Sequence, residues 1–393
     1  MNTQPEKLYL KSGEERRLKT GHPWIFSNEL KQVPVHLPAG SLVEVFSAGG
    51  DSFGLGFFNP HSLISVRLLW AQSLPDPRAF LTERISDALA LRNRLFPDEE
   101  AIRVVFGESD FLPGLVVDKY GDYLSVQFLS AGMELWKEDV VHVLKTVLPG
   151  TKGIVEKNRS ASRLLEGLDQ REGVLDGEVP EVVTISESGI RYDLSLTDGQ
   201  KTGYFLDQKL NRLAIHSVSA GSRVLDCFCN QGGFALHASQ AGAAVVTGVD
   251  LSEEAIRRAT QNARVNNLNA AFVQADVFRY LQEAGTRKEQ WDVIILDPPG
   301  FAKSKKHVPA AKKGYLEINR QALRLIPQGG FLVTSSCSQH IFEETFLDII
   351  HDASRQTGRH LRQIFRGQQA PDHPILESMS ETRYLKFFIF QVF

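Results

Sequence analysis

The feature that most constrains the fold is an alternation of apolar strand-like runs with helical patterns, which begins near residue 197. The apolar runs are SRVLDCF, AVVTGVD, AAFVQAD, WDVIILDPP and GGFLVTSSC. Because continuous apolar strands joined by helices must be buried on both faces, this alternation predicts an α/β domain with a doubly wound parallel sheet. Two final runs, HLRQIFRGQ and RYLKFFIFQVF, have no long helix between them and predict an antiparallel hairpin at the C-terminal sheet edge.

Two further parts are expected before this sheet, because a chain of 393 residues exceeds the roughly 250–300 residues of an ordinary single core. Residues 1–75 contain short strand-like runs separated by turn residues and predict a small β-barrel. Residues 76–189 alternate strand-like and helical runs and predict an α+β middle domain. Residues 190–393 then form the doubly wound domain.

Composition excludes several classes of protein. No run of about 18 apolar residues could cross a bilayer, so no membrane partner is expected. The N-terminal segment lacks the apolar core of a secretory signal, and three cysteines make a disulfide scaffold improbable. These features predict a protein of the reducing cytoplasm.

Any contact with nucleic acid must be local, because 44 Lys and Arg residues against 47 Asp and Glu residues leave a net charge of −3. Two basic clusters qualify. Taken alone, either cluster is more typical of a solvated face than of a binding site. The residues chosen as RNA-binding are Arg16, Arg17 and Lys19 near the start, and Lys303, Lys305 and Lys306 after the fourth strand of the sheet.

Residues that follow the strands are candidates for ligand binding, because ligands of open α/β sheets lie outside the carboxyl ends of the strands. Gly232 and Gly233 follow the first strand, although a tight turn alone could require glycine. Asp226, Asp250 and Asp276 occur at the ends of three successive strands, where single acids are usually caps. An acid there can also accept hydrogen bonds from ribose hydroxyls or an adenine amino group.

These motifs resemble those of class I S-adenosylmethionine-dependent methyltransferases. VLDCFCNQGG resembles their donor-binding loop, VTGVD their ribose acid and VQADV their adenine acid. The resemblance implies S-adenosyl-L-methionine as the cofactor. The segment 197–212 resembles the one that closes over the donor in the RNA-base members. This resemblance implies further cofactor-binding residues at Gln200, Lys201, Thr202, Phe205 and Asp207.

Two candidate catalytic residues follow the next strands, Asp297 in the turn Asp297-Pro298-Pro299 and Cys337 at the end of GGFLVTSSC. Asp297 is also expected beside the donor's methyl group. Carbon 5 of a pyrimidine becomes nucleophilic only after a thiolate adds to carbon 6, which is the role considered for Cys337. A buried carboxyl could assist by supplying or positioning a proton. By default, a cysteine in an apolar strand is a packing residue.

Cys227 and Cys229 are interpreted as packing residues, because their i, i+2 spacing fits neither a zinc site nor a redox pair. No other set of metal ligands is evident, so no metal is predicted.

The segment LKSGEERRLKTGHPWIFSNEL resembles the opening of a PUA RNA-binding domain as found in the family of 23S rRNA cytosine-C5 methyltransferases. That family has the order PUA, small α+β domain, catalytic domain. The resemblance implies 23S rRNA as the partner and methylation of cytosine C5 through Cys337. Asn230-Gln231 departs from the Tyr-Thr common in relatives, which bears on the substrate or subfamily.

Two rival functions remain open. Asp297-Pro298-Pro299 resembles the motif with which amino-group methyltransferases grip an exocyclic nitrogen. A non-catalytic RNA-binding assembly factor is disfavoured, since Asp250, Asp276, Asp297 and Cys337 are all present. The sequence leaves open the modified nucleotide and whether the chain forms a homodimer.

Overall fold

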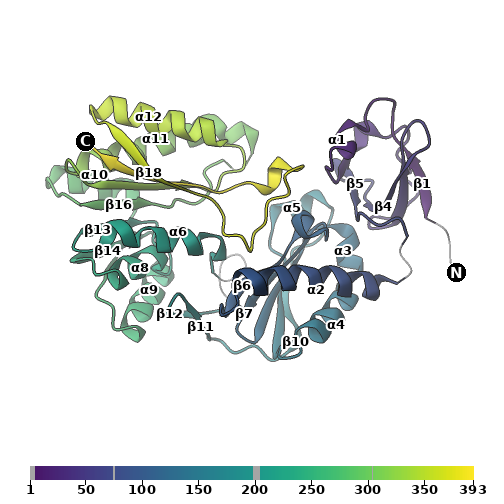
Figure 1. The fold of residues 1–393 in the computed structure, drawn as a ribbon, viewed down its shortest axis with the longest axis horizontal. Coiled ribbons are helices and arrows are strands. Elements are labelled where there is room, and N and C mark those ends of the chain that lie inside the picture. The colour runs from purple at the N-terminus through teal and green to yellow at the C-terminus, as the bar shows by residue number, and fades with distance from the viewer. Residues whose placement is uncertain (1–4, 74–75, 198–203, 303) are drawn as a thin grey trace. The chain divides into compact units, whose positions relative to one another are not determined.

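The computed structural model describes residues 5–73, 76–197, 204–302 and 304–393, and the chain divides into two compact units (Figure 1). The first unit comprises Met1–Ile185, Leu194–Leu206 and Pro371–Thr382. The second comprises Ser186–Asp193, Asp207–Ala370 and Arg383–Phe393. Within the described ranges, no helix is long and apolar enough to cross a membrane.

The first unit begins with a five-stranded sheet of order β1-β3-β4-β5-β2, in which only β1 and β3 run parallel. The strands are β1 (Glu6–Tyr9), β2 (Trp24–Phe26), β3 (Leu42–Phe46), β4 (Ser52–Phe58) and β5 (Ile64–Leu68), with the short helix α1 (Arg16–Lys19) between β1 and β2. The expected barrel does not close. Its edge strands have four and three residues, and a single bridge, Leu10 to Leu30, lies between their ends.

The α+β region predicted after it contains a second five-stranded sheet, of order β10-β9-β8-β7-β6. Its strands are β6 (Ala101–Phe106), β7 (Leu115–Tyr120), β8 (Tyr123–Phe128), β9 (Gly153–Lys157) and β10 (Glu172–Gly177). Its helices are α2 (Pro77–Leu95), α3 (Ala131–Leu135), α4 (Lys137–Val147) and α5 (Ala161–Leu165). Helix α2 starts where Asp76 accepts a 2.9 Å hydrogen bond from the Ala79 amide and Pro77 fixes the first turn.

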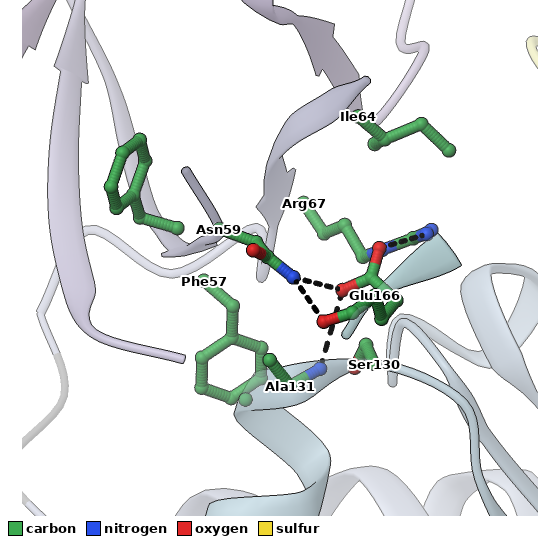
Figure 2. A pocket seen from close by; sticks show the side chains of 9 residues that line it. Phe57, Asn59, Ile64, Arg67, Ser130, Ala131 and Glu166 are labelled. Atoms are coloured by element: carbon green, nitrogen blue, oxygen red, sulfur yellow. Dashed lines mark hydrogen bonds and ion pairs between the residues drawn. The ribbon is translucent and has the colours of Figure 1, made fainter. Parts of the chain in front are cut away.

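Buried charges join these two sheets inside the first unit. Arg67 of β5 donates to Glu166 at 3.0 Å and to Glu108 at 2.9 Å. Figure 2 shows Asn59 and Arg67 converging on Glu166, whose Oε2 accepts from Asn59 at 3.0 Å. Because removing one partner of a buried pair leaves an uncompensated charge, this network strongly favours one arrangement of the two sheets.

The second unit contains a seven-stranded sheet of order β15-β14-β13-β16-β17-β19-β18. The first five of these strands are parallel, whereas β19 is antiparallel to both β17 and β18. This confirms the predicted doubly wound sheet and its C-terminal hairpin. The strands are β13 (Arg223–Cys227), β14 (Val245–Asp250), β15 (Ala271–Gln274), β16 (Val293–Leu296), β17 (Phe331–Ser336), β18 (Leu361–Gly367) and β19 (Lys386–Val392).

Helices cover both faces of this sheet (Figure 1). Ile294 and Leu296 of β16 belong to the core that includes α10 (Val277–Thr286), α11 (Val308–Leu325) and α12 (Glu343–Thr357). The alternating residues Val293 and Ile295 belong to the opposite core, with α8 (Gly233–Gln240). The same side as α8 also carries α6 (Lys209–Ala214) and α9 (Glu253–Val265). Val218 of α7 (His216–Ser219) belongs to the same core as α8. Burial on both faces explains why β16 is apolar along its whole length.

The chain passes repeatedly between the units. The hairpin β11 (Val183–Glu187) and β12 (Ile190–Leu194) turns through Ser188 and Gly189, whose φ angles are 52° and 80°, as a tight two-residue turn requires. The connection from β18 to β19 contributes Pro371–Thr382 to the first unit. There the carbonyl of Asp372 accepts from Arg92 at 2.9 Å, and Ser378 donates to the Gly21 carbonyl at 2.7 Å.

Candidate active site

The candidate site lies at the carboxyl edge of the seven-stranded sheet, where the strand order reverses. Strand β13 lies between β14 and β16. The strands β14 and β15 are therefore added on one side of β13, and β16 and β17 are added on its other side. Ligands of open α/β sheets bind at this kind of switch point. Asp250, Asp297 and Cys337 follow or end three of the strands that meet at this edge.

The loop after β13 is wound into an unusual backbone conformation. Phe228, Asn230 and Gly232 have φ angles of 64°, 48° and 84°, so three of its residues are left-handed. At Gly232 a Cβ would also lie 3.1 Å from the Phe272 ring. Non-glycine residues are held in this region only where the surroundings enforce it, which is common at ligand sites. Both the conformation and the packing therefore require glycine at position 232.

Asp250 fixes the far side of this loop. Its Oδ2 accepts a 2.9 Å hydrogen bond from the Asn230 amide, and its Oδ1 accepts one of 2.9 Å from the Ser252 amide. Ser252 in turn caps α9 through the Ala255 amide at 3.2 Å. Because each carboxylate oxygen has a second lone pair, Asp250 can still accept two hydroxyl groups from a ligand.

The other two acids of the series have different surroundings. Asp226 is fully buried, and its Oδ2 accepts a 2.9 Å hydrogen bond from the Ala235 amide in α8. Burial raises the pKa of Asp226 well above its ordinary value, which favours the protonated form of the side chain. Asp276 is exposed, and its Oδ1 caps α10 through the Arg279 amide at 2.9 Å.

The segment before β13 is only partly described. Gln200, Lys201 and Thr202, like the whole stretch 198–203, lie outside the described residues. Phe205 is half-buried and belongs to the first unit. Asp207 opens the second unit, where its Oδ2 accepts a 2.7 Å hydrogen bond from the Tyr384 hydroxyl.

Asp297 is held by two hydrogen-bond donors. The Gln208 side-chain amide donates to its Oδ1 at 2.9 Å, and the Ser335 hydroxyl donates to the same oxygen. Burial raises the pKa of Asp297 to about 6, although both hydrogen bonds act to lower it. Asp297 therefore changes charge close to neutral pH. Sequence reasoning missed both Gln208 and Ser335.

Cys337 lies at the end of β17 and is half-buried. The turn that follows Asp297 reaches it, because a Cβ on Gly300 would lie 3.6 Å from the Cys337 Sγ and from the Ser338 Oγ. The Ala302 amide also donates to the Ser338 Oγ at 3.3 Å. The structure thus brings together the two candidate catalytic motifs, on adjacent strands of the sheet.

The residues on either side of Cys337 are fixed by one tyrosine and one lysine. Ser336 Oγ donates to the Tyr315 hydroxyl at 2.9 Å, and that hydroxyl lies 3.0 Å from the Ser338 Oγ. Lys386 Nζ donates to the Ser338 carbonyl at 2.8 Å. Sequence reasoning missed both Tyr315 and Lys386, although a lysine inside the apolar run RYLKFFIFQVF was a usable signal.

The basic residues expected to bind RNA differ in their exposure and in their ion pairs. Lys305 and Lys306 are exposed ahead of α11, while Lys303 is outside the described residues. Arg16 and Lys19 are also exposed, and Lys19 lies 3.6 Å from Glu15. Arg17 forms a 2.6 Å ion pair with Glu29 and stacks on Phe26. Its guanidinium is therefore less available to an RNA phosphate than the side chains of Arg16 and Lys19.

Cys227 and Cys229 are buried, and burial raises the pKa of each thiol well above its ordinary value. Within the part of the chain that is described, no three His, Cys, Asp or Glu side chains are grouped so as to hold a metal ion.

Comparison with known proteins agrees with this geometry. Residues 8–70 match the model of a PUA-like domain, and residues 168–388 match that of an S-adenosylmethionine-dependent methyltransferase. A Streptococcus mutans protein, assigned as an S-adenosylmethionine-dependent methyltransferase and of known structure, has the same fold. It is 24% identical, with a TM-score of 0.85 over 98% of this chain and all of that one. The fold and site define an S-adenosylmethionine-dependent methyltransferase with an N-terminal PUA-like domain.

Curated relatives identify the family within this class of methyltransferases. The ribosomal RNA large subunit methyltransferase I of Photobacterium profundum is 39% identical over 97% of this chain and 98% of that one. The Vibrio cholerae protein of the same name is 37% identical over 98% and 99%. The chain belongs to the ribosomal RNA large subunit methyltransferase I family. Its methyl donor is S-adenosyl-L-methionine.

Proposed function

We propose that this protein transfers a methyl group from S-adenosylmethionine to carbon 5 of a cytosine in 23S rRNA, with Cys337 as the nucleophile. The relatives are named for the large ribosomal subunit, and a ribosomal substrate would be met in the cytoplasm. The observation that carries the proposal is the position of the Cys337 thiol against the turn that follows Asp297. A thiol beside the acceptor motif is needed for carbon-5 chemistry and has no function in methylation of a nitrogen.

The proposed donor site uses the elements that follow β13, β14 and β15. The loop with Gly232 and Gly233 would lie against the donor's methionine portion, Asp250 would accept the ribose hydroxyls, and Asp276 would accept the adenine amino group. Asp250 fits this role well because both of its oxygens are already oriented by backbone amides. When bound, the donor supplies a methyl group on a positively charged sulfur.

The proposed reaction proceeds through Cys337 and the base. The thiolate Sγ adds to carbon 6, and the electrons of the 5,6 double bond move into the ring as N3 takes up a proton. Carbon 5 then bonds to the methyl carbon while the bond from that carbon to the donor's sulfur breaks. N3 then gives up its proton and water takes the carbon-5 proton, so that the electrons of the carbon–hydrogen bond restore the 5,6 double bond and expel the thiolate. Asp297, with its pKa of about 6, is suited to hold the proton that N3 gains and loses.

Methylation of an exocyclic nitrogen is the rival, because Asp297 could instead grip an amino group. One oxygen of Asp297 already accepts hydrogen bonds from Gln208 and Ser335, which leaves the other for the base. Nitrogen has its own lone pair and needs no thiol, so this rival gives no role to Cys337.

The test uses RNA that carries 5-fluorocytosine, which can accept both the thiol and the methyl group but has no carbon-5 proton to lose. The wild-type protein should form a complex with this RNA that survives denaturation. Cys337→Ala should form none and should not methylate, whereas Cys227→Ala serves as the matched control and should retain the adduct. Full methyl transfer by Cys337→Ala, or an N-methylated base in the digested product, would overturn the proposal.

A further inference from the structure

Lys386 is a buried cation inside an apolar strand, which is an expensive place for an ammonium group. It is the first residue of β19, its neighbours Phe387 and Phe388 are fully buried, and only 5% of its own surface is exposed. Burying a charge without compensation costs several kcal/mol, so such a lysine needs partners or a function.

The position of Lys386 is set by the sheet. Lys386 pairs with Ser336 in the antiparallel ladder between β17 and β19, so it lies directly across from the residue before Cys337. Its Nζ donates to the Ser338 carbonyl at 2.8 Å and to the Tyr384 carbonyl at 2.8 Å. The lysine therefore fixes the backbone on the far side of the thiol, one residue beyond it.

The ammonium keeps one N–H beyond these two contacts. It has three donors, and among the described residues Nζ makes only the two hydrogen bonds to carbonyl groups and no ion pair. Neutral carbonyl groups satisfy its hydrogen bonds without cancelling its charge. The charge is therefore available to an anion that forms beside it.

Tyr315, Glu343 and Asp297 are other titratable groups near this cluster. Tyr315 of α11 reaches Ser336 and Ser338 from one side, and burial raises the pKa of its phenol, which keeps it neutral. Glu343, at the start of α12, is the carboxylate whose charge reaches Lys386, and it already forms a 2.6 Å ion pair with Arg366. The Asp297 carboxyl accepts a hydrogen bond from the Ser335 hydroxyl, two residues before Cys337. Lys386 thus places a positive charge across the ladder from Ser336, close enough for a Cys337 thiolate to raise the pKa of the lysine.

We propose that Lys386 is the positioning residue for Cys337: it holds the turn after the thiol in place, and its charge stabilises the thiolate that attacks the base. The inference rests on the proposed role of Cys337 as the nucleophile. The charges of the thiolate and of Lys386 favour each other, and burial lowers the pKa of Lys386 to about 8, so it stays protonated at neutral pH.

The reaction cycle gives this arrangement a purpose. The thiol must lose its proton before it adds to carbon 6, and the thiolate must be a good leaving group when the cycle ends. A fixed cation beside the sulfur favours both events, because it stabilises the same thiolate at the start and at the end.

The experiment follows the rate at which Cys337 is alkylated by iodoacetamide, a neutral reagent, from pH 5 to pH 10. Peptide mass spectrometry separates Cys337 from the buried Cys227 and Cys229. In Lys386→Met, the rate at pH 7 should fall roughly tenfold for each unit by which the thiol pKa rises. The rates of variant and wild type should converge at the alkaline end. Lys386→Arg should keep the wild-type profile, because it retains the charge.

Lys312→Met is the matched control, since it removes an exposed cation from the same unit. A purely structural role for Lys386 would lower the alkylation rate by one factor at every pH and leave the inflection unmoved, which would overturn the inference. The result is independent of methyl transfer. If Cys337→Ala still methylates while the alkylation profile behaves as expected, the proposed function fails and the relation between Lys386 and Cys337 stands.

Discussion

The side-chain amide of Gln208 donates a 2.9 Å hydrogen bond to Oδ1 of Asp297. Gln208 ends a short 3-10 helix within the segment 197–212, and Asp297 begins the turn that carries the acceptor motif. One hydrogen bond thus connects the stretch expected to close over the donor with the residue expected to meet the base. This contact favours the ionised carboxyl, whereas burial favours the protonated one. As a result, the pKa of Asp297 is about 6.

That balance predicts how Asp297 affects stability. Its folded pKa is raised from 3.8 to about 6, so the folded protein holds a proton that the unfolded chain releases between these values. Stability from this group is therefore full below pH 4 and is lost as the pH rises through 6. Asp297→Asn should be more stable than wild type by about 2–3 kcal/mol at pH 8, with no gain at pH 4. Urea denaturation at both pH values measures this.

The control for this prediction is Asp352→Asn, which changes an exposed acid on α12. It should give no stabilisation that grows with pH. An Asp297→Asn protein that is less stable than wild type at pH 8 would mean that the carboxylate is fully compensated and that its raised pKa is not a property of the folded protein.

Donor binding depends on Asp250 if the proposed site is correct. Asp250→Ala removes an ionised acceptor from the ribose hydroxyls and should weaken S-adenosylmethionine binding by about 1.5–3 kcal/mol. This corresponds to a rise in Kd of roughly 10- to 150-fold, measurable by calorimetric titration. Ser252→Ala is the matched control, because it removes the cap of α9 and leaves the Asp250 carboxylate. An unchanged Kd in folded Asp250→Ala would remove Asp250 from the donor site.

RNA binding is expected to depend on both basic clusters to different degrees. Arg16 and Lys19 are exposed, whereas Arg17 is paired with Glu29. The double variant Arg16→Ala/Lys19→Ala should therefore weaken binding almost as much as the variant that also replaces Arg17. For each side chain that no longer pairs with a phosphate, the slope of log K against log salt should fall by about 0.7 for single-stranded RNA.

Lys305→Ala/Lys306→Ala provides the comparison, since these exposed lysines precede the helix that carries Tyr315. Filter-binding measurements over a range of salt concentrations distinguish the clusters. If neither double variant changes the slope, both clusters are solvated faces and the RNA is held elsewhere.

The seven-stranded sheet was predictable because the alternation of apolar runs with helical patterns repeats along the sequence. The central parallel strand β16 is apolar along its whole length, since alternate residues such as Val293 and Ile294 pack against helices on opposite faces. Closure of the N-terminal barrel was not predictable in this way. It depends on whether β1 and β2 are long enough to pair, and local strand signals do not determine that.

The site was predictable only where its residues directly follow strands. That rule selected Asp250, Asp297 and Cys337 as candidates, and the structure brings the Asp297 turn against the Cys337 thiol. Gln208, Tyr315 and Lys386 were missed because they reach the site from a preceding segment, a helix and an antiparallel strand. Their contacts are set by tertiary packing, for which a single sequence gives no spacing rule.

A substitution at Gly300 tests whether the base approaches the Cys337 thiol past the turn that follows Asp297. A methyl group at this position would lie 3.6 Å from the Cys337 Sγ and from the Ser338 Oγ, which is ordinary van der Waals contact, so Gly300→Ala should fold. It would nevertheless fill the approach to the sulfur between the turn and β17. Because a misplacement of about 1 Å in a reacting pair can lower a rate roughly a hundredfold, kcat/KM for methylation should fall about ten- to hundredfold.

Three measurements separate this effect from general damage. The Kd for S-adenosylmethionine and the urea midpoint of Gly300→Ala should match wild type, while alkylation of Cys337 should slow together with methylation. Gly285→Ala is the control, because its added methyl group would meet only Leu325 at 3.9 Å on α11, away from the thiol. If Gly300→Ala methylates at the wild-type rate, the base does not approach Cys337 past this turn.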